Sequence, residues 1–135
     1  MKRRSQILLI LIVIALLYPF EATIVPEWRL RVVDETGRPF ADARVVQQWN
    51  HYSLDISGGE EKWADKDGNV VFPKRTTRTP LLYRILRTAW AHLMTLFHGS
   101  TGIRASVRAT TPEDSSDSVE YQEGKSLPDV IVLRR

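Results

Sequence analysis

The chain has 135 residues, 43% of them hydrophobic and 26% charged, and a formal net charge of +3. This length fits one domain, and the composition is ordinary for a globular protein. The sequence contains no cysteine, which excludes disulfides, thiolate nucleophiles and cysteine-based zinc sites.

The N-terminus carries Lys2, Arg3 and Arg4 and continues as an unbroken apolar run over residues 7–20. A cationic start before an apolar core is typical of a secretory signal. A helix over this run covers only about 21 Å, whereas a helix extended to Val25 covers about 28 Å, close to a hydrocarbon core of about 30 Å. We therefore expect residues 1–26 to form a hydrophobic helix that acts as an uncleaved signal anchor.

The alternative for this segment is a cleaved signal peptide. Cleavage after Ala22 would put Phe20 at the position where a small side chain is favoured. The basic residues should stay in the cytoplasm, which places residues 27–135 on the extracytoplasmic side. We expect a single-pass protein of the cell membrane with a periplasmic or extracellular domain, or a secreted protein if the segment is cleaved.

Most of residues 27–135 is expected to form short β-strands. Apolar and polar residues alternate in these strands, which is the pattern of a sheet with one buried face. Gly37-Arg38-Pro39 and Asp67-Gly68 supply turn signals between them. We expect loops at 57–61 and at the acidic stretch 110–124. The predicted strands cover residues 28–32, 43–49, 70–72, 103–110 and 129–133, and together they predict an all-β sandwich.

Two phrases, VVDETGRPFADARV at residues 32–45 and ADKDGNVVF at residues 64–72, resemble the carboxypeptidase regulatory-like family. The resemblance implies a mainly β, transthyretin-like (prealbumin-like) sandwich of about seven strands. It also implies an accessory module without catalytic activity. The hydroxyisourate hydrolases, an enzymatic branch of this fold, end in Tyr-Arg-Gly-Ser. This chain ends in Val132-Leu-Arg-Arg, so that activity is not implied.

Residues 80–98 depart from the family pattern, because their spacing predicts an amphipathic helix inserted in the sandwich. We expect Thr79 or Pro80 to begin the helix and Gly99 to end it. Its apolar stripe either packs on the sandwich as part of the core or faces a membrane or partner. The stripe comprises Leu82, Ile85, Leu86, Ala89, Trp90, Leu93, Leu96 and Phe97.

Charge is segregated around this helix. Seven basic residues and no acidic residue lie between 69 and 112, whereas five acidic residues and no basic one lie between 113 and 123. Basic residues beside aromatic and aliphatic ones suit a helix at a membrane surface. Nucleic-acid binding is a third interpretation, and the predicted export argues against it. The candidate membrane- or partner-facing residues are Arg78, Arg84, Arg87, Trp90 and Phe97.

A polar and aromatic stretch at the end of the second predicted strand is the candidate recognition surface. Amphipathic aromatic side chains beside amides suit contact with a peptide or a glycan. The alternative is that Trp49 and Tyr52 fill the core and leave the amides at its edge. The residues of this candidate surface are Gln48, Trp49, Asn50, His51 and Tyr52.

Metal and catalytic sites are not expected. Asp65, Asp67 and Asn69 mimic the first ligands of a calcium loop, but Val70 stands where that loop needs glycine, so an Asp-Gly turn is the better interpretation.

His51, Ser53 and Asp55 would share one strand face. Neighbours on one face lie about 6.5–7 Å apart, too far for a nucleophile to meet its base. His92 and His98 do not share a helix face, so they do not predict a metal site.

The sequence therefore predicts a non-catalytic extracytoplasmic interaction or structural module, tethered to the membrane and without a cofactor. Its partner would be a protein, a glycan or the membrane surface. The alternative is a small hydrolase on the same fold. That alternative requires a polar concave site around His51, with Asp55 or Glu60 nearby and a shifted histidine pKa.

Overall fold

The computed structural model describes residues 3–98, 102–116 and 118–134. Two helices, α1 (Arg3–Leu17) and α2 (Leu81–His98), accompany ten strands within these residues. The strands are β1 (Pro19–Val25), β2 (Trp28–Val33), β3 (Arg44–His51), β4 (Ile56–Trp63), β5 (Asn69–Phe72), β6 (Arg75–Pro80), β7 (Ile103–Thr110), β8 (Ser115–Ser116), β9 (Val119–Gln122) and β10 (Val130–Arg134).

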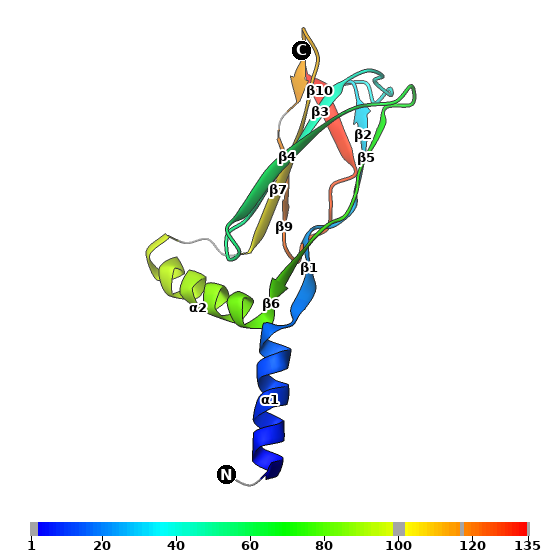
Figure 1. Ribbon diagram of the computed structural model, residues 1–135. Helices are drawn as coiled ribbons and strands as arrows, with labels where there is room; N and C mark the ends of the chain where they lie inside the picture. The colour runs from blue at the N-terminus through cyan, green and yellow to red at the C-terminus, as the bar shows by residue number, and fades with distance from the viewer. Residues whose placement is uncertain (1–2, 99–101, 117, 135) are drawn as a thin grey trace.

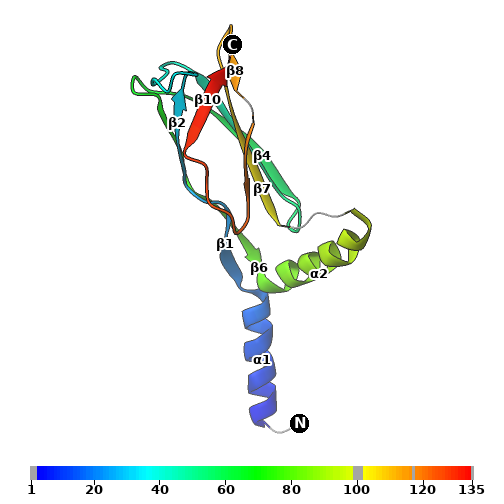
Figure 2. The ribbon, with the colours of Figure 1, turned by 180° about the vertical axis from the view of Figure 1, so that it is seen from behind.

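Most of the strands belong to one sheet of order β4-β3-β7-β8-β10-β2-β5, with β9 also paired to β7. The β4-β3-β7-β9 part of this sheet faces the β10-β2-β5 part, so the two parts form the layers of a sandwich (Figures 1 and 2). The short strand β8 pairs with both β7 and β10 and joins the layers. The predicted mainly β, sandwich-like architecture is confirmed.

The core lies between the layers and is built by alternating side chains. In β7, Ile103, Ala105, Val107 and Ala109 are buried, while the residues between them are exposed or half-buried. Trp28 at the start of β2 is fully buried, and its indole N–H donates to the carbonyl oxygen of Pro128 at 2.6 Å. A buried indole N–H needs such an acceptor. This bond therefore holds the segment just before β10 against the start of β2.

Two regions predicted as loops are strands. Residues 56–63 form β4, which pairs along its whole length with β3, and residues 119–122 form β9 beside β7. The second region is rich in acidic residues, but it contains a short alternation of apolar and polar residues. Val119 and Tyr121 of this alternation pack against the core. In the first region, Gly58 stands directly opposite Trp49. A Cβ atom at Gly58 would lie 2.5 Å from the indole ring, so the glycine makes room for tryptophan.

Strands β1 and β6 form a separate two-stranded antiparallel ribbon, here called the stem. Figure 1 shows the stem at one end of the sandwich, with α1 leaving it away from the sandwich and α2 crossing beneath the sheets. The register pairs Pro19 with Pro80. The end of α1 and the start of α2 are therefore neighbours, although more than sixty residues separate them in sequence.

The expectation of one helix reaching Val25 is wrong, because α1 ends at Leu17 and the following residues form β1. Pro19 lacks the amide hydrogen that a helix needs, and the β-branched residues Thr23, Ile24 and Val25 favour a strand. No helix among the described residues is both long enough and apolar enough to cross a membrane.

The inserted helix predicted over 80–98 is confirmed by α2, which starts directly after Pro80. The predicted closing residue, Gly99, lies outside the described residues. The interpretation of α2 as a core element is wrong, however. Most of its large apolar side chains are exposed, with Leu86 at 61% and Leu96 at 81% exposure.

The predicted Asp-Gly turn at 65–69 is confirmed, and it depends on Asp65 and Gly68. The Asp65 carboxylate accepts hydrogen bonds from the amides of Asp67 and Asn69, at 2.9 and 2.8 Å, and these bonds lower the Asp65 pKa. Gly68 has a φ of 78°. A Cβ atom there would lie 2.5 Å from the carbonyl oxygen of Val32.

Replacing Gly68 by alanine should therefore strain the backbone and push β2 away from the turn. We expect G68A to lower the free energy of unfolding by about 2–4 kcal/mol, measured by urea denaturation. The control is G124A. Gly124 also has a positive φ of 83° but has no atom within 4 Å of an added Cβ, so only the backbone term of about 1 kcal/mol applies. Equal losses in the two variants would contradict the close approach to Val32.

Candidate functional site

The polar face of α2 is turned toward the end of the sandwich. Arg84, Arg87 and Thr88 are half-buried there, and Arg87 lies 3.6 Å from the carboxylate of Asp55 in the β3–β4 turn. A cavity of about 290 Å³ separates the helix from the strand ends. We call it the His51 cavity, and it is lined by His51, Ser53, Leu54, Arg84, Thr88, His92, Gly102 and Glu123.

The apolar face of α2 is turned the other way. Its side chains are between 37% and 81% exposed. An exposed contiguous apolar surface of this kind marks a site of contact with lipid or protein. We call it the α2 apolar face, and it comprises Leu82, Ile85, Leu86, Trp90, Leu93 and Leu96.

The candidate residues of the basic helix are thus separated by the structure. Trp90 is exposed on the α2 apolar face, whereas Arg84 and Arg87 point at the sandwich. This corrects the expectation that these two guanidinium groups face a membrane. Arg87 lies beside Asp55, and Arg84 belongs to the polar lining of the His51 cavity. Phe97 lies in α2, but its side chain is outside the described part of the structure.

Arg78 belongs to the stem rather than to the helix. Its side chain is 76% exposed and lies 3.9 Å from Glu21, the residue opposite it in β1. An exposed pair at this distance contributes little to stability. The Arg78 charge therefore remains available at the surface beside the start of α2.

His51 is the most chemically distinctive group of the His51 cavity. Its Nδ1 accepts a hydrogen bond from the amide of Leu54 at 3.3 Å. Burial lowers the pKa of His51, and the charge of Arg84 lowers it further, while Glu123 acts in the opposite direction. The imidazole is therefore held in its neutral form at pH 7.

The predicted requirements of a hydrolase are met in part. A concave site surrounds His51 and its pKa is shifted, but Asp55 is an exposed partner of Arg87, and Glu60 pairs with Arg75 at another edge of the sandwich. Within the described residues, no hydrogen bond joins His51 to Ser53, and no group of three metal-ligating side chains is present. The activated nucleophile that acyl transfer needs is not assembled there.

The predicted recognition surface is divided between four places. Trp49 packs partly against the core, which agrees with the alternative interpretation for that residue. His51 lines its cavity, and Tyr52 is exposed with the guanidinium of Arg104 at 6.0 Å from its ring. Gln48 and Asn50 point outward from the sheet. Strand alternation explains this division, because consecutive residues face opposite sides.

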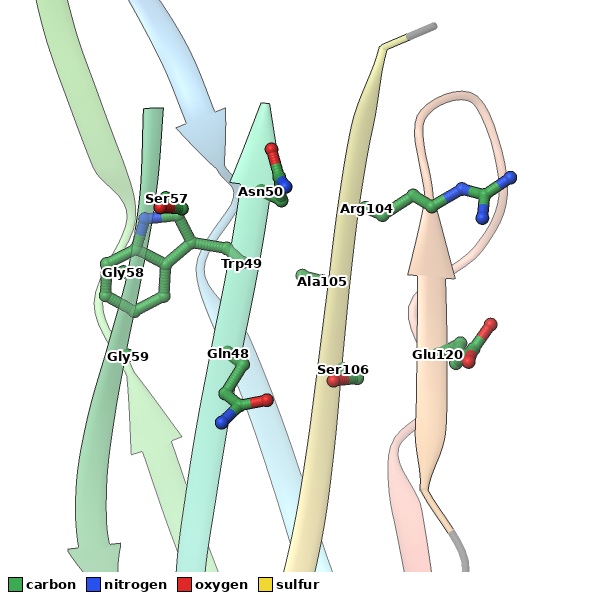
Figure 3. Close-up of a pocket in the computed structure, with 10 residues that line it drawn as sticks. All are labelled: Gln48, Trp49, Asn50, Ser57, Gly58, Gly59, Arg104, Ala105, Ser106 and Glu120. Atoms are coloured by element: carbon green, nitrogen blue, oxygen red, sulfur yellow. The ribbon is translucent and has the colours of Figure 1, made fainter. Parts of the chain in front are cut away.

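Gln48 and Asn50 border a shallow hollow of about 480 Å³ on the outer face of the β4-β3-β7-β9 layer (Figure 3). The hollow exists because Gln48 is flanked across the strands by Gly59 and Ser106, whose side chains are small. No hydrogen bond within the described residues occupies the side chains of Gln48, Asn50 or Ser106. We call this site the outer hollow, and its polar lining is Gln48, Asn50, Ser57, Arg104, Ser106 and Glu120.

A charged cluster at the open edge of the sandwich was not predicted. Glu60 of β4 forms an ion pair with Arg75 of β6, and the Arg75 guanidinium lies over the ring of Trp49 at 4.4 Å from its centroid. Lys62 donates to the carbonyl oxygen of Val71 at 2.7 Å. These contacts join β4 to β5 and β6. The sequence signal is the alternation of Gly58, Glu60 and Lys62, most of which lies in the segment 57–61 that was predicted to be a loop.

Gln47 is a second unpredicted feature. It lies between Val45 and Trp49 on the inner face of β3, as the alternation predicts, and it is fully buried. Neither polar atom of its side-chain amide has a partner among the described residues. A buried amide without partners destabilises a fold.

No family model matches the chain, and no curated protein is significantly similar to it. The resemblance of residues 32–45 and 64–72 to the carboxypeptidase regulatory-like family therefore stays a prediction. What the protein does must follow from the chemistry of its own surfaces.

The state of His51 can be measured by NMR titration. We expect a pKa below the ordinary value of about 6.5. R84Q should raise it, because a repelling charge is removed, and E123Q should lower it further. Because the folded-state pKa is lower than the unfolded one, neutral His51 contributes stability above about pH 6.5, and this contribution is lost as the pH falls toward the folded value. A pKa at or above 6.5 would contradict the burial of this imidazole.

Arg75 should matter for stability more than Arg78, although both belong to β6. We expect R75A to lower the free energy of unfolding by about 1–3 kcal/mol, because it removes the closer of the two cationic partners of half-buried Glu60, leaving only Lys62 at 3.8 Å, and uncovers the Trp49 ring. The matched control R78A should change it by less than about 0.5 kcal/mol. Thermal unfolding followed by circular dichroism measures both, and equal effects would show that the edge cluster contributes nothing.

Proposed function

We propose that the protein is a non-catalytic interaction module that α1 tethers to the outer face of the cytoplasmic membrane. The observation that carries the proposal is the surface of α1. Its apolar side chains are exposed on every side of the helix, and Figure 2 shows α1 projecting from the rest of the molecule. An apolar helix surface without a protein partner is suited to lipid. These side chains are Ile7, Leu8, Leu9, Ile10, Leu11, Ile12, Val13, Ile14 and Leu17.

The length of α1 limits how it sits in lipid. Its 15 residues cover about 22 Å, which is shorter than a hydrocarbon core of about 30 Å. Short helices are accommodated by local thinning and by basic side chains that extend to the headgroups, as Arg3 and Arg4 can. At the other end, Tyr18 and Phe20 form an exposed aromatic pair with ring centroids 4.8 Å apart. Exposed aromatic rings at this position suit the membrane interface.

The stem favours retention of the N-terminal segment. Cleavage after Ala22 would remove four of the six residue pairs between β1 and β6, those of Pro19, Phe20, Glu21 and Ala22. Only the pairs of Thr23 and Val25 would remain. The second half of β6 and the start of α2 would then lack a neighbouring strand. An uncleaved anchor keeps the stem whole.

The interaction role is supported by the rest of the domain. The turn phrases resemble those of transthyretin-like sandwiches that serve as accessory modules, and we assign residues 27–135 to this fold. The outer hollow offers free amide and hydroxyl groups, together with the opposite charges of Arg104 and Glu120. Such a lining suits a polar ligand that is itself rich in hydrogen-bonding groups, such as a glycan or an extended peptide backbone.

A small hydrolase is the second candidate, and the His51 cavity is the observation that favours it. The cavity holds a neutral imidazole, a buried serine hydroxyl and the Glu123 carboxylate. A neutral imidazole is the form that acts as a general base. A hydrolytic activity lost in both H51Q and S53A would favour this candidate over the binding module.

The tether is tested by introducing charge into α1. We expect the full chain to stay in the membrane pellet after alkaline extraction and the double variant I10E/V13E to be released. A charge at the centre of a membrane helix costs about 2.5–3.5 kcal/mol. The matched control V71E/V130E introduces the same charges at exposed apolar residues of the sandwich and should remain in the pellet. Release of the unmodified chain would contradict the proposed tether.

A further inference from the structure

We propose that α2 lies along the surface of the bilayer with the α2 apolar face in the lipid, so that the sandwich is held in one orientation above the membrane. This inference rests on the proposed tether, because α1 brings α2 to the membrane. It adds a second contact with lipid and assigns an apolar surface that the fold leaves uncovered.

The direction of the helix faces is the first observation. A helix beside a sandwich normally buries its apolar face against the sheet, and α2 does the reverse. Leu86, Leu93 and Leu96 are at least half exposed, while Arg84 and Arg87 are turned inward. This arrangement is stable only if the apolar face meets another apolar environment.

The polar surroundings favour this orientation of α2. Arg87 lies 3.6 Å from Asp55, and Arg84 lines the His51 cavity together with Glu123. Tyr52, Arg87 and Thr95 line a neighbouring cavity along the same side of the helix, and Trp90, which is 57% exposed, lies at the border between this cavity and the α2 apolar face. Rotating α2 to bury its leucines would break the ion pair and would bring these polar groups to the lipid-facing side.

The stem supplies the second observation, which is the height of α2 along the molecule. Pro19, two residues after the end of α1, pairs with Pro80, which directly precedes α2. The level at which α1 leaves the lipid is therefore the level at which α2 begins. Figures 1 and 2 show α2 running crosswise to α1 at this level, between α1 and the sheets.

Charge and aromatic residues agree with an interfacial position. The sequence from 69 to 112 holds no acidic residue, so nothing on α2 repels anionic headgroups. Arg78 is exposed beside the start of the helix, and Tyr83 and Trp90 are exposed on it. Basic side chains and amphipathic aromatic rings are the residues that helices use at the headgroup level.

Lipid is favoured over a protein partner because the α2 apolar face adjoins the exposed surface of α1. One environment, the outer leaflet of the bilayer, then covers both the α2 apolar face and the adjoining surface of α1. A partner protein would have to cover α2 at the position where the proposed anchor enters the membrane.

Spin labels at introduced cysteines test the inference, and the chain has no cysteine of its own to interfere. The full chain is reconstituted in nanodiscs of phosphatidylcholine and phosphatidylglycerol as L86C, L93C, L11C or E35C. Leu11 lies on α1, and Glu35 lies on an exposed turn of the sandwich. Collision rates with oxygen, which concentrates in lipid, and with a nickel chelate, which stays in water, are then measured.

We expect labels at Leu86 and Leu93 to resemble the label at Leu11, with frequent oxygen collisions and at least fivefold fewer nickel collisions than at Glu35. If they resemble Glu35 while Leu11 remains in lipid, the inference is wrong and the tether stands. If they are shielded from both reagents, a protein covers the face and the inference is also wrong. Nickel access at Leu11 would overturn the tether, and with it the inference.

A second measurement avoids the labels. Tryptophan fluorescence of the unmodified chain is recorded in nanodiscs that contain brominated lipid, and the fraction quenched is compared with that of W90F. We expect W90F to lose most of the quenching, because Trp28 is buried and Trp49 and Trp63 lie on the sandwich. Equal quenching in the two proteins would overturn the inference.

Discussion

The pairing of β1 with β6 is the contact on which the arrangement of the molecule depends. These strands continue from β2 and β5, which are neighbours in the sheet, so the same two chain segments run side by side from the core to the two helices. Without the pairing, α1 and α2 would each hang from a free strand. With it, the register at Pro19 and Pro80 fixes where α1 ends and where α2 begins. Local sequence cannot encode such a contact, and it closes a loop of about sixty residues against chain entropy.

The sandwich itself was largely predictable because its information is local. Alternation in β2 and β7 and the Asp-Gly turn place strands and buried residues correctly. Two strands were predicted as loops because their composition is typical of loops and their apolar-polar alternation is short. These are β9, which lies in an acidic segment, and β4, which begins in a glycine-rich one. The extent of α1 was overestimated because hydropathy alone does not distinguish a helix from the β-branched strand that follows it.

The candidate sites were less predictable for a physical reason. Helical periodicity identifies the two faces of α2 but does not say which face meets the sandwich, since that depends on partners such as Asp55 and Glu123. The His51 cavity combines residues from the β3–β4 turn, α2 and the end of β9, which come together only in the folded chain. The outer hollow depends on which small residues stand across from Gln48, and that is decided by the register of three strands.

The inward-facing charges of β4 have a further consequence. Among the described residues, β4 pairs only with β3, so its other edge presents free amides and carbonyls. Such an edge invites a strand from a second copy. The proposed tether would keep copies at similar height and orientation, so that their edges meet repeatedly. Glu60 and Lys62 point into the sandwich along this edge, and an added strand would have to bury or displace them. The same residues that close the sandwich thus disfavour sheet-by-sheet aggregation through this edge.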